Sequence, residues 1–287
     1  MKALIDGDII VYSVGFATEQ TTYSVQGMPC IDKKEANLLA DHLNVPRDEI
    51  EAHTLAEPES HAFHNAKKLI NKICETVGAD SYEVFLTGHG NYREDAATIQ
   101  PYKGNRDTSH KPIHYAAIKE YLIKTHGAEV IEGMEADDKL GIEQFNSKEN
   151  TTCICSIDKD LDMIPGHHYN WRKDEKYFIT EEEAMFNFYL QLLTGDQTDN
   201  IRGVPQIGKI KANKILDGCK SELCAYNRVR QTYLNYYRKE AEKNNESLSE
   251  EELLERSDKD LLENATLLWI LREEEGFWTP PTAQEEE

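Results

Sequence analysis

The feature that most constrains this chain is a set of acidic residues that recurs at the ends of short apolar runs. The densest group lies in residues 133–140, which read GMEADDKL. Helical spacing places Glu135 and Asp138 on one face of a helix, with Asp137 beside them. Three carboxylates this close repel one another, so a helix N-terminus or a divalent cation must stabilise them.

Similar acidic groups follow other apolar runs, namely Asp6/Asp8, Asp158/Asp160/Asp162 and Asp196/Asp199. A single E-x-D-D sequence is compatible with a solvated acidic turn. Repetition at the ends of apolar segments favours one shared metal site, assembled from distant parts of the chain, because Mg²⁺ and Mn²⁺ prefer carboxylate oxygens. Asp8 is equally compatible with a role as N-cap of a helix that starts at residue 9.

The first half of the chain alternates between strand-like and helix-like patterns. Strands are predicted at 3–5, 82–87, 129–131, 151–157 and 167–171, and helices at 9–16, 60–77, 112–126 and 136–145. This alternation predicts an α/β fold with a mainly parallel central sheet flanked by helices. Functional groups gather at the carboxyl ends of such strands, where Asp6 would lie. A small hairpin is expected at 22–31 and a surface excursion at 44–59.

From residue 180 the pattern becomes helical. Thr180 and Glu183 form a capping box for a helix that runs through residue 193. Residues 195–209 then read GDQTDNIRGVPQIGK, which predicts a tight hairpin followed by a second helix. Gly203 and Gly208 are expected to adopt positive φ, so that a phosphate can approach the backbone near the second helix's N-terminus. Further helices are expected at 226–264 and 266–272.

These patterns divide the chain into two predicted domains. Residues 1–179 form the α/β core, with a short arch or loop near 91–126. Residues 180–287 form a helical region whose hairpin can bind a phosphate backbone, and its acidic C-terminal tract ends in a frayed tail at 280–287.

The net charge of −21 argues at first against a nucleic-acid partner. However, residues 239–287 carry 16 acidic and 5 basic residues, so about half of the excess lies in the last sixth of the chain. Residues 202–220 are locally basic, because five Lys and Arg residues oppose Asp217 alone. Such a local basic face can hold phosphates while the rest of the surface stays acidic.

Cysteine usage and hydropathy bear on the cellular compartment. The six cysteines show neither C-x-x-C nor zinc-finger spacing, which predicts free thiols in a reducing compartment. No apolar run reaches a membrane-spanning length, and the N-terminus does not read as a signal peptide. A cytoplasmic protein without a membrane partner is expected.

Two glycine-flanked stretches with spaced cations follow the strand at 82–87. The first contains Arg93 and the second contains Lys103 and Arg106, within Y-K-G-N-R at 102–106. Cations spaced in this way predict a phosphate-facing loop, although plain surface charges would give the same pattern.

Five motifs stand in order along nearly the whole chain. They are D-G-D at 6–8, Y-K-G-N-R at 102–106, G-M-E-A-D-D at 133–138, S-I-D-K-D at 156–160 and G-D-Q-T-D-N-I-R-G-V-P-Q-I-G at 195–208. Together they resemble the flap endonuclease/5′-nuclease superfamily, which includes phage-encoded 5′→3′ exonucleases and the 5′-nuclease domain of bacterial DNA polymerase I. The resemblance implies a PIN-like 5′-nuclease core and a C-terminal helix-hairpin-helix (H3TH) region.

The resemblance also implies a phosphodiesterase that uses two or more Mg²⁺ or Mn²⁺ ions. One ligand group would be Asp6, Glu135, Asp137 and Asp158, and the other Asp160, Asp196 and Asp199, with Asp138 in the same acidic cluster and the partition left open. Paired ions activate water and stabilise the leaving oxygen. The catalytic residues would be Asp158 together with Lys103 and Arg106, the last two at the scissile phosphate.

The resemblance further implies residues that contact DNA. Tyr102 would stack on a base near the cut. The hairpin would bind the duplex backbone with K⁺. The expected DNA-binding residues are Tyr102, Arg93, Arg202, Gly203, Val204, Gly208, Lys209 and Lys211.

The sequence departs from the superfamily's pattern in two places. Leu86 and Gly88 stand where many members carry a further acid, so one metal is expected to be held more weakly. Only 32 positions separate Lys103 from Glu135, which is short for a full helical arch. A short arch puts threading of a single-stranded flap in doubt and favours exonuclease action from a duplex 5′ end.

The function expected from these observations is a 5′→3′ exonuclease or flap endonuclease. It would act as a monomer on double-stranded DNA with 5′ ends, nicks or flaps during replication, with RNA in hybrids left open and the host cytoplasm as its location if it is phage-encoded. A non-catalytic DNA-junction binder and a PIN-like RNase are the alternatives. Lys103, Arg106 and the nearly complete acid set argue against the first, and the duplex-binding hairpin argues against the second.

Overall fold

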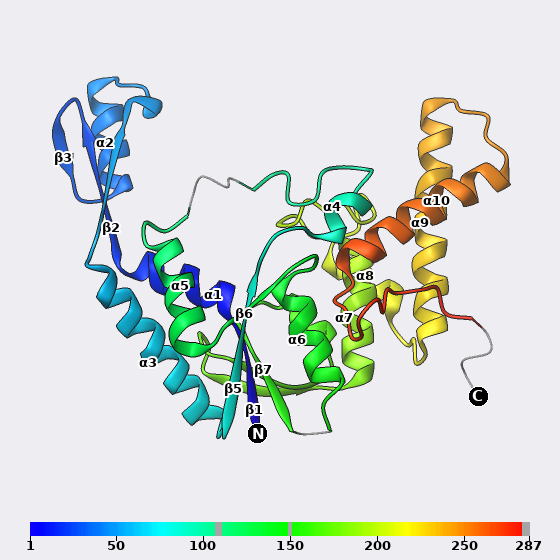
Figure 1. Cartoon of the computed structure of the whole chain (residues 1–287). Helices are drawn as coiled ribbons and strands as arrows, with labels where there is room; N and C mark the ends of the chain where they lie inside the picture. The colour runs from blue at the N-terminus through cyan, green and yellow to red at the C-terminus, as the bar shows by residue number, and fades with distance from the viewer. Residues whose placement is uncertain (107–110, 149–150, 283–287) are drawn as a thin grey trace.

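A six-stranded sheet forms the centre of the protein, and the computed structural model describes residues 1–106, 111–148 and 151–282 around it (Figure 1). The strand order is β6-β5-β1-β7-β8-β9. All neighbours are parallel except β8 and β9. The strands are β1 (Lys2–Asp6), β5 (Ser81–Thr87), β6 (Glu129–Ile131), β7 (Thr152–Cys155), β8 (Gly166–Asn170) and β9 (Glu175–Ile179). The predicted mainly parallel α/β fold is confirmed, whereas β9 was not predicted.

Strand β1 is buried on both faces, as a central parallel strand requires. Ala3 and Ile5 pack into a core that is covered by helices α1, α3 and α5, while Leu4 faces the opposite side against α6. The alternation follows from the two-residue period of a strand. The helices are α1 (Gly7–Ala17), α3 (Glu59–Val77), α5 (Tyr115–His126) and α6 (Ala136–Phe145).

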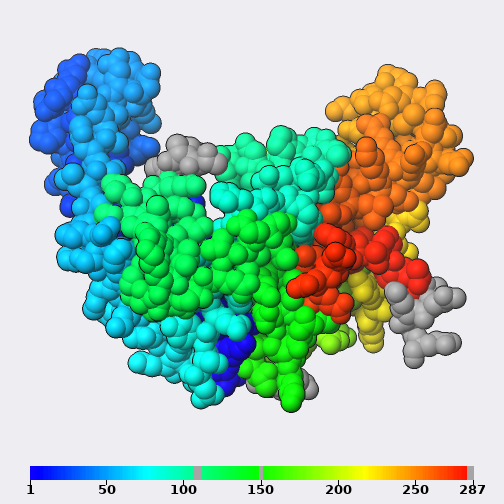
Figure 2. Space-filling view, viewed as in Figure 1, coloured from blue at the N-terminus to red at the C-terminus, as the bar shows by residue number. Residues whose placement is uncertain are grey.

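A small three-stranded sheet is inserted between α1 and α3. The hairpin predicted at 22–31 is confirmed, since Tyr23 pairs with Cys30 around a turn at Gln26 and Gly27. The expected surface excursion instead contains a third strand that pairs with β2. The insert has its own small core and projects from the main body at the upper left of Figures 1 and 2. Its elements are β2 (Glu19–Val25), β3 (Met28–Cys30), α2 (Lys33–Leu43), η1 (Arg47–Glu49) and β4 (Glu51–Ala56).

The second half of the chain is helical, as predicted, and the capping box of Thr180 and Glu183 is present. Its helices share one core that includes Phe188, Leu216 and Val229. The helix expected at 266–272 is wrong, because the last helix ends at Leu268 and the backbone then becomes extended. The helices are α7 (Glu181–Thr194), α8 (Lys209–Leu216), α9 (Glu222–Asn244) and α10 (Glu250–Leu268).

The segment between β5 and α5 begins with the short helix α4 (Tyr92–Ala96). Residues 97–106 and 111–114, within the short arch or loop region predicted near 91–126, contain no helix or strand. Residues 107–110 of that arch and residues 283–287 of the expected frayed tail lie outside the described residues. All six cysteines are free thiols, as expected. Within the described residues, no helix is both long and apolar enough to cross a membrane.

Candidate active site

Asp6 lies at the carboxyl end of β1 and is almost fully buried, with 2% of its surface exposed. Its Oδ1 accepts the N–H of Ile9 at 3.0 Å, and its Oδ2 accepts the hydroxyl of Ser156 at 2.7 Å. Asp6 is therefore the N-cap of α1, a role that the sequence allowed for Asp8. Asp8 instead accepts the N–H of Thr87 at the end of β5, at 2.9 Å.

Three carboxyl groups of the acidic cluster, including that of Asp6, have raised pKa values. Burial raises the pKa of Asp6 to about 7, and the charges of Asp8 and Asp158 add to that shift. Burial also raises the pKa of Asp160 to about 7, with the charge of Asp158 as the next cause. The pKa of Asp137 is raised by burial and then by the charges of Asp6, Asp158 and Glu135. Lys103, Lys159 and hydrogen bonds compensate these carboxylates only in part, and this oxygen-rich donor set fits Mg²⁺ or Mn²⁺.

Glu135 is the N-cap residue of α6 and connects this cluster to the loop at 97–106. Its carboxylate accepts hydrogen bonds from Asn91 at 3.0 Å and from the Tyr102 hydroxyl at 3.1 Å. It also forms an ion pair with Lys103. The N-terminus of α6 thus places Glu135 where the predicted catalytic loop meets the acidic cluster.

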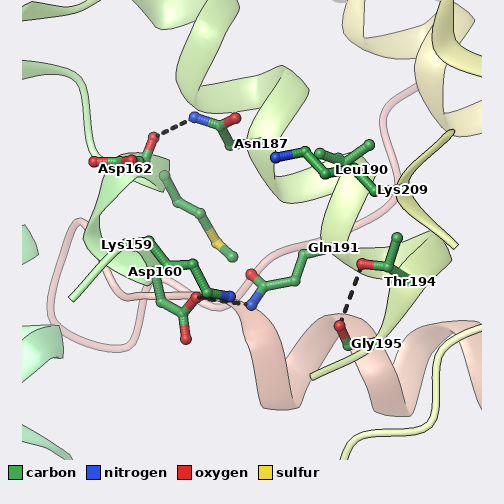
Figure 3. A pocket seen from close by; sticks show the side chains of 10 residues that line it. Lys159, Asp160, Asp162, Asn187, Leu190, Gln191, Thr194, Gly195 and Lys209 are labelled. Atoms are coloured by element: carbon green, nitrogen blue, oxygen red, sulfur yellow. Dashed lines mark hydrogen bonds and ion pairs between the residues drawn. The ribbon is translucent and has the colours of Figure 1, made fainter. Parts of the chain in front are cut away.

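A second acidic group is held together by Gln191 of α7. Its Nε2 donates to Asp160 at 2.9 Å and to Asp196 at 3.1 Å, so one amide joins carboxylates from two segments. Figure 3 shows the hydrogen bond between Gln191 and Asp160, which both line a cavity of about 290 Å³. Burial opposes ionisation of Asp196, but the N–H groups of Thr198 and Asp199 and the charge of Lys159 hold its pKa below the usual value.

A small cavity of about 30 Å³ lies where these groups meet. That volume accommodates a water-sized group, which needs roughly 10–15 Å³. Five of the predicted metal ligands line it: Glu135, Asp137, Asp160, Asp196 and Asp199. Asp6 and Asp158 are close enough to raise the pKa of Asp137. The structure therefore brings together seven of the eight predicted ligands.

The two predicted catalytic cations lie against this cavity. Lys103 pairs with Glu135 and lies 3.7 Å from Asp199, and Arg106 pairs with Asp199. Within the described part of the chain, no group of three or more His, Cys, Asp or Glu side chains is arranged to hold a metal ion. The hydroxyl of Tyr102 donates to Asp199 at 2.9 Å, and its ring packs against the helical core. The stacking of Tyr102 on a base near the cut stays a prediction.

Arg93 and Asp138 require a correction. The predictions placed Arg93 on DNA and Asp138 among the metal ligands, but they form a buried two-pronged ion pair with distances of 2.6 and 2.8 Å. Arg93 is 2% exposed and also donates to the carbonyls of Leu267 and Trp269. Asp138, which is fully buried, also accepts the N–H of Leu271. The pair connects α6 to the end of α10 and the segment after it. Because both side chains are buried, neither is accessible to DNA or to a cation.

In and beside the hairpin at 195–208, some of the predicted DNA-binding residues are exposed and others are buried. Gly203 has φ +57 and lies against the backbone of Gly195, where a Cβ would come within 2.2 Å of a backbone atom. Gly203 and Val204 are buried, so their predicted contact with DNA is wrong and they serve packing. The positive φ expected at Gly208 is also wrong, because its φ is −93 and Gln206 has φ +67 instead. The exposed members of the predicted set are Arg202, Gly208, Lys209 and Lys211.

A groove of about 470 Å³ runs beside the hairpin. Residues 204–207 form one side, and the C-terminal half of α9 contributes Lys239 and Lys243 to the other. Lys211 also lines this groove. The basic surface expected at 202–220 thus continues onto a helix that belongs to the acidic C-terminal tract.

Comparison with known proteins finds no family model that matches the chain. DNA polymerase I of Bacillus caldotenax is 27% identical over 182 residues, which covers 55% of this chain and 20% of that protein. The thermostable DNA polymerase I of Thermus caldophilus is 29% identical over 174 residues, which covers 56% of this chain and 20% of that protein. The chain thus spans about a fifth of the length of the curated relatives that it matches.

The fold agrees with a solved structure over most of both chains. The T5 D15 protein, co-crystallised with metal ions, superposes with a TM-score of 0.50 at 16% identity and covers 93% of each chain. The five motifs, the polymerase relatives and this fold agree with one another. The chain therefore resembles the flap endonuclease/5′-nuclease superfamily. Among the solved structures is also the bacteriophage T5 D15 flap endonuclease with DNA and metal ions, at TM-score 0.49 and 15% identity, covering 92% of this chain and 98% of that chain.

The site contains residues that sequence reasoning missed. Gln191 joins two acidic segments, and Ser156 holds Asp6 while it accepts the N–H of Asp158 at 3.0 Å. Ser156 lies within the S-I-D-K-D motif and could have been found there. Gln191 lies one helical turn before the G-D-Q-T-D motif, among apolar residues, where a buried amide stands out only after its partners are known. Leu86, which stands where many members of the superfamily carry a further acid, is fully buried in the core.

Proposed function

We propose that this chain is a divalent-metal-dependent 5′→3′ exonuclease and flap endonuclease that hydrolyses phosphodiester bonds at 5′ ends, nicks or flaps of DNA in replication. The observation that carries the proposal is the small cavity lined by five carboxylates, with Lys103 and Arg106 paired to two of them. Its DNA polymerase I relatives and its structural likeness to a protein co-crystallised with metal ions support this function.

The residues that would hold Mg²⁺ or Mn²⁺ form two neighbouring groups. Asp6, Glu135, Asp137 and Asp158 form one, and Asp160, Asp196 and Asp199 form the other. When bound, a pair of such ions would supply an activated water and stabilise the leaving oxygen. Burial, and after it the charges of neighbouring carboxylates, raises the pKa values of Asp6, Asp137 and Asp160.

Lys103 and Arg106 supply the positive charge for the substrate. Both belong to the loop at 97–106, and each now pairs with a carboxylate beside the cavity. A phosphate that enters there meets an ammonium and a guanidinium on one side, which offset the charge that develops in the transition state. The backbone N–H of Lys103 donates to the carbonyl of Asp199 at 2.9 Å, which keeps the loop at the site.

The hairpin and its flanking helices would bind the duplex. Gly208 and the N-terminus of α8 are exposed, and Lys209 and Lys211 follow on the same turn. N–H groups at a helix N-terminus bind phosphate without reading sequence. We propose K⁺ at this hairpin, action as a monomer in the cytoplasm, and a division into a 1–179 core and a 180–287 DNA-binding region. RNA in hybrids remains a candidate substrate.

The test uses a 5′-labelled nicked duplex and a matched 5′-flap duplex, each with Mg²⁺ or with EDTA. The proteins are wild type, Lys103→Ala, Asp158→Asn and the control Lys68→Ala, which changes an exposed lysine of α3. Metal-dependent release of mononucleotides from the nick is expected from wild type and the control. Asp158→Asn should lose more than about 100-fold in rate, because even outer-shell partners of metals cost 10–100-fold.

Two results would separate this proposal from its alternatives. Asp158→Asn should still bind the nicked duplex, so an equal loss of binding and cleavage would contradict a metal role for Asp158. Binding by wild type without any cleavage would favour a non-catalytic junction binder. One longer product from the flap would show that the short arch admits a single strand.

A further inference from the structure

The loop that carries Lys103 and Arg106 is held from the far end of the chain. Glu263 of α10 is buried, with 8% of its surface exposed. Its Oε1 accepts the N–H groups of Thr98 and Ile99, both at 2.7 Å. Its Oε2 accepts the hydroxyl of Thr98. One carboxylate therefore receives three hydrogen bonds from two consecutive loop residues.

The three hydrogen bonds to Glu263 fix the backbone conformation of the loop at Thr98 and Ile99. Glu263 makes no ion pair within the described residues, so the three donors are what stabilise its buried charge. Hydrogen bonds to an ionised acceptor are stronger than neutral ones, and two successive N–H groups aimed at one oxygen define the backbone conformation. Losing this acceptor would leave both N–H groups without a protein partner.

The path from Glu263 to the catalytic cations is short and continuous. Gln100, the next residue after Ile99, donates to the carbonyl of Asn200 at 2.6 Å. Asn200 in turn donates to the carbonyl of Pro101 at 2.9 Å. Lys103 has a positive φ of 54, which costs free energy for a residue with a side chain and persists only where the surroundings impose it. The loop is thus fixed at Thr98–Ile99 before it reaches this strained position.

We propose that Glu263 is a positioning residue, which from α10 fixes the loop that presents Lys103 and Arg106 to the scissile phosphate. The acidic C-terminal tract thereby contributes to catalysis through one buried carboxylate. The inference rests on the proposed function, because the position of the two cations matters to the rate only if the chain cleaves.

The test compares Glu263→Ala with Glu263→Gln. Glutamine keeps the oxygen that accepts both N–H groups, and its amide can donate to the Thr98 hydroxyl, whereas alanine loses all three bonds. Glu255→Ala is the matched control, because Glu255 is an exposed acid of the same helix. Thr98→Val is a fourth variant that weakens the contact from the loop side and leaves α10 unchanged.

Hydrogen exchange provides a readout that does not depend on nuclease activity. In peptides covering residues 97–106, Glu263→Ala should exchange about tenfold faster or more, since protected N–H groups open with their local stability. Glu263→Gln and Glu255→Ala should exchange as wild type does. Wild-type protection of this loop in Glu263→Ala would overturn the proposal.

Cleavage of the nicked duplex with Mg²⁺ then tests the catalytic consequence. Glu263→Ala should lower kcat roughly 10- to 100-fold, because misplacement of a reacting group by about 1 Å costs that much. KM should change less than about threefold, since the hairpin binds the duplex elsewhere. Glu263→Gln should restore kcat. A faster-exchanging loop with unchanged kcat would overturn the positioning role.

Two further results keep the test decisive. If Glu263→Ala does not fold, Thr98→Val should still speed exchange in the loop and lower kcat about threefold, and wild-type behaviour on both measures would overturn the proposal. If wild type does not cleave, the proposed function fails and the catalytic role of Glu263 fails with it, while the exchange data still report the contact itself.

Discussion

Asp137 and Asp138 are neighbours in the first turn of α6, yet they belong to different regions of the molecule. Asp137 lines the small cavity, and burial together with Asp6, Asp158 and Glu135 raises its pKa. Asp138 is fully buried and paired through both oxygens with Arg93. Adjacent carboxylates of one motif thus differ, because Asp138 is neutralised by a buried ion pair whereas Asp137 lies among other acids.

The two regions have opposite energetics. In the Arg93–Asp138 region every charged atom has a partner, and the pair joins α4, α6 and the segment after α10. In the cavity region carboxylates face one another, which costs free energy in the absence of a cation. Stability and function therefore use adjacent residues of one motif in opposite ways.

The largest effect is expected where one member of the neutralised pair is removed. Asp138→Asn leaves the buried Arg93 without its counter-charge and should destabilise the protein by about 3–5 kcal/mol. Asp137→Asn should cost no stability in EDTA, because it removes a repelling charge. Urea unfolding of both variants in EDTA at pH 8 measures the difference. Equal destabilisation would remove the distinction between the two regions.

The next effect concerns pH and the cavity region alone. The pKa of Asp6 rises from 3.8 to about 7 on folding, so the folded protein binds more protons and loses stability as pH increases between these values. At about 1.4 kcal/mol per pKa unit the loss is at most about 4 kcal/mol. Asp160 contributes in the same direction.

Asp6→Asn tests whether stability decreases as pH increases because of this carboxyl group. Its carboxamide oxygen can still accept the N–H of Ile9, while the charge is lost. Urea unfolding in EDTA should show wild type less stable at pH 8 than at pH 5, and the variant should show a smaller difference. Lys68→Ala serves as a control on the exposed surface. A wild-type stability that rises over this range would contradict uncompensated carboxylates at the cavity.

The sequence predicted the sheet, the order of the motifs and the gathering of carboxylates, because apolar runs and helix caps are local patterns. It could not separate Asp137 from Asp138, since the deciding partner, Arg93, lies 45 residues away. The same distant pair explains why the helix expected at 266–272 ends early: Arg93 binds the carbonyls of Leu267 and Trp269. Gly208 was assigned a positive φ that Gln206 adopts instead.

A smaller effect is expected where an uncharged group supports the cavity region. Gln191→Leu removes the amide that joins Asp160 to Asp196 and leaves both carboxylates without that donor. Metal affinity should fall about 10–100-fold, as it does when outer-shell partners of metal ligands are lost. Titration with Mn²⁺ followed by calorimetry measures this without any cleavage. Gln231→Leu changes an exposed glutamine of α9 as the control, and an unchanged Mn²⁺ affinity in Gln191→Leu would separate Gln191 from the metal site.

The smallest effects are expected at the groove beside the hairpin. Its lysines would pair with the phosphates of the DNA duplex. Lys209→Ala with Lys211→Ala should weaken duplex binding and lower the slope of log K against log salt by roughly one to two units. Lys239→Ala with Lys243→Ala should give a similar decrease if the groove lies on the DNA, because both lysines line it beside residues 204–207.

The salt dependence of duplex binding compares the basic groove with exposed lysines elsewhere on the protein. Lys33→Ala with Lys34→Ala, on the projecting insert, is the matched control and should leave the slope unchanged. All of these lysine variants should keep the kcat of wild type at saturating DNA, because none lines the small cavity of about 30 Å³ between the carboxylates. An unchanged slope for Lys209 and Lys211 would remove the hairpin from the interface. A change at Lys239 and Lys243 alone would move the duplex onto α9, so that the tract with the largest acidic excess would carry the DNA contact.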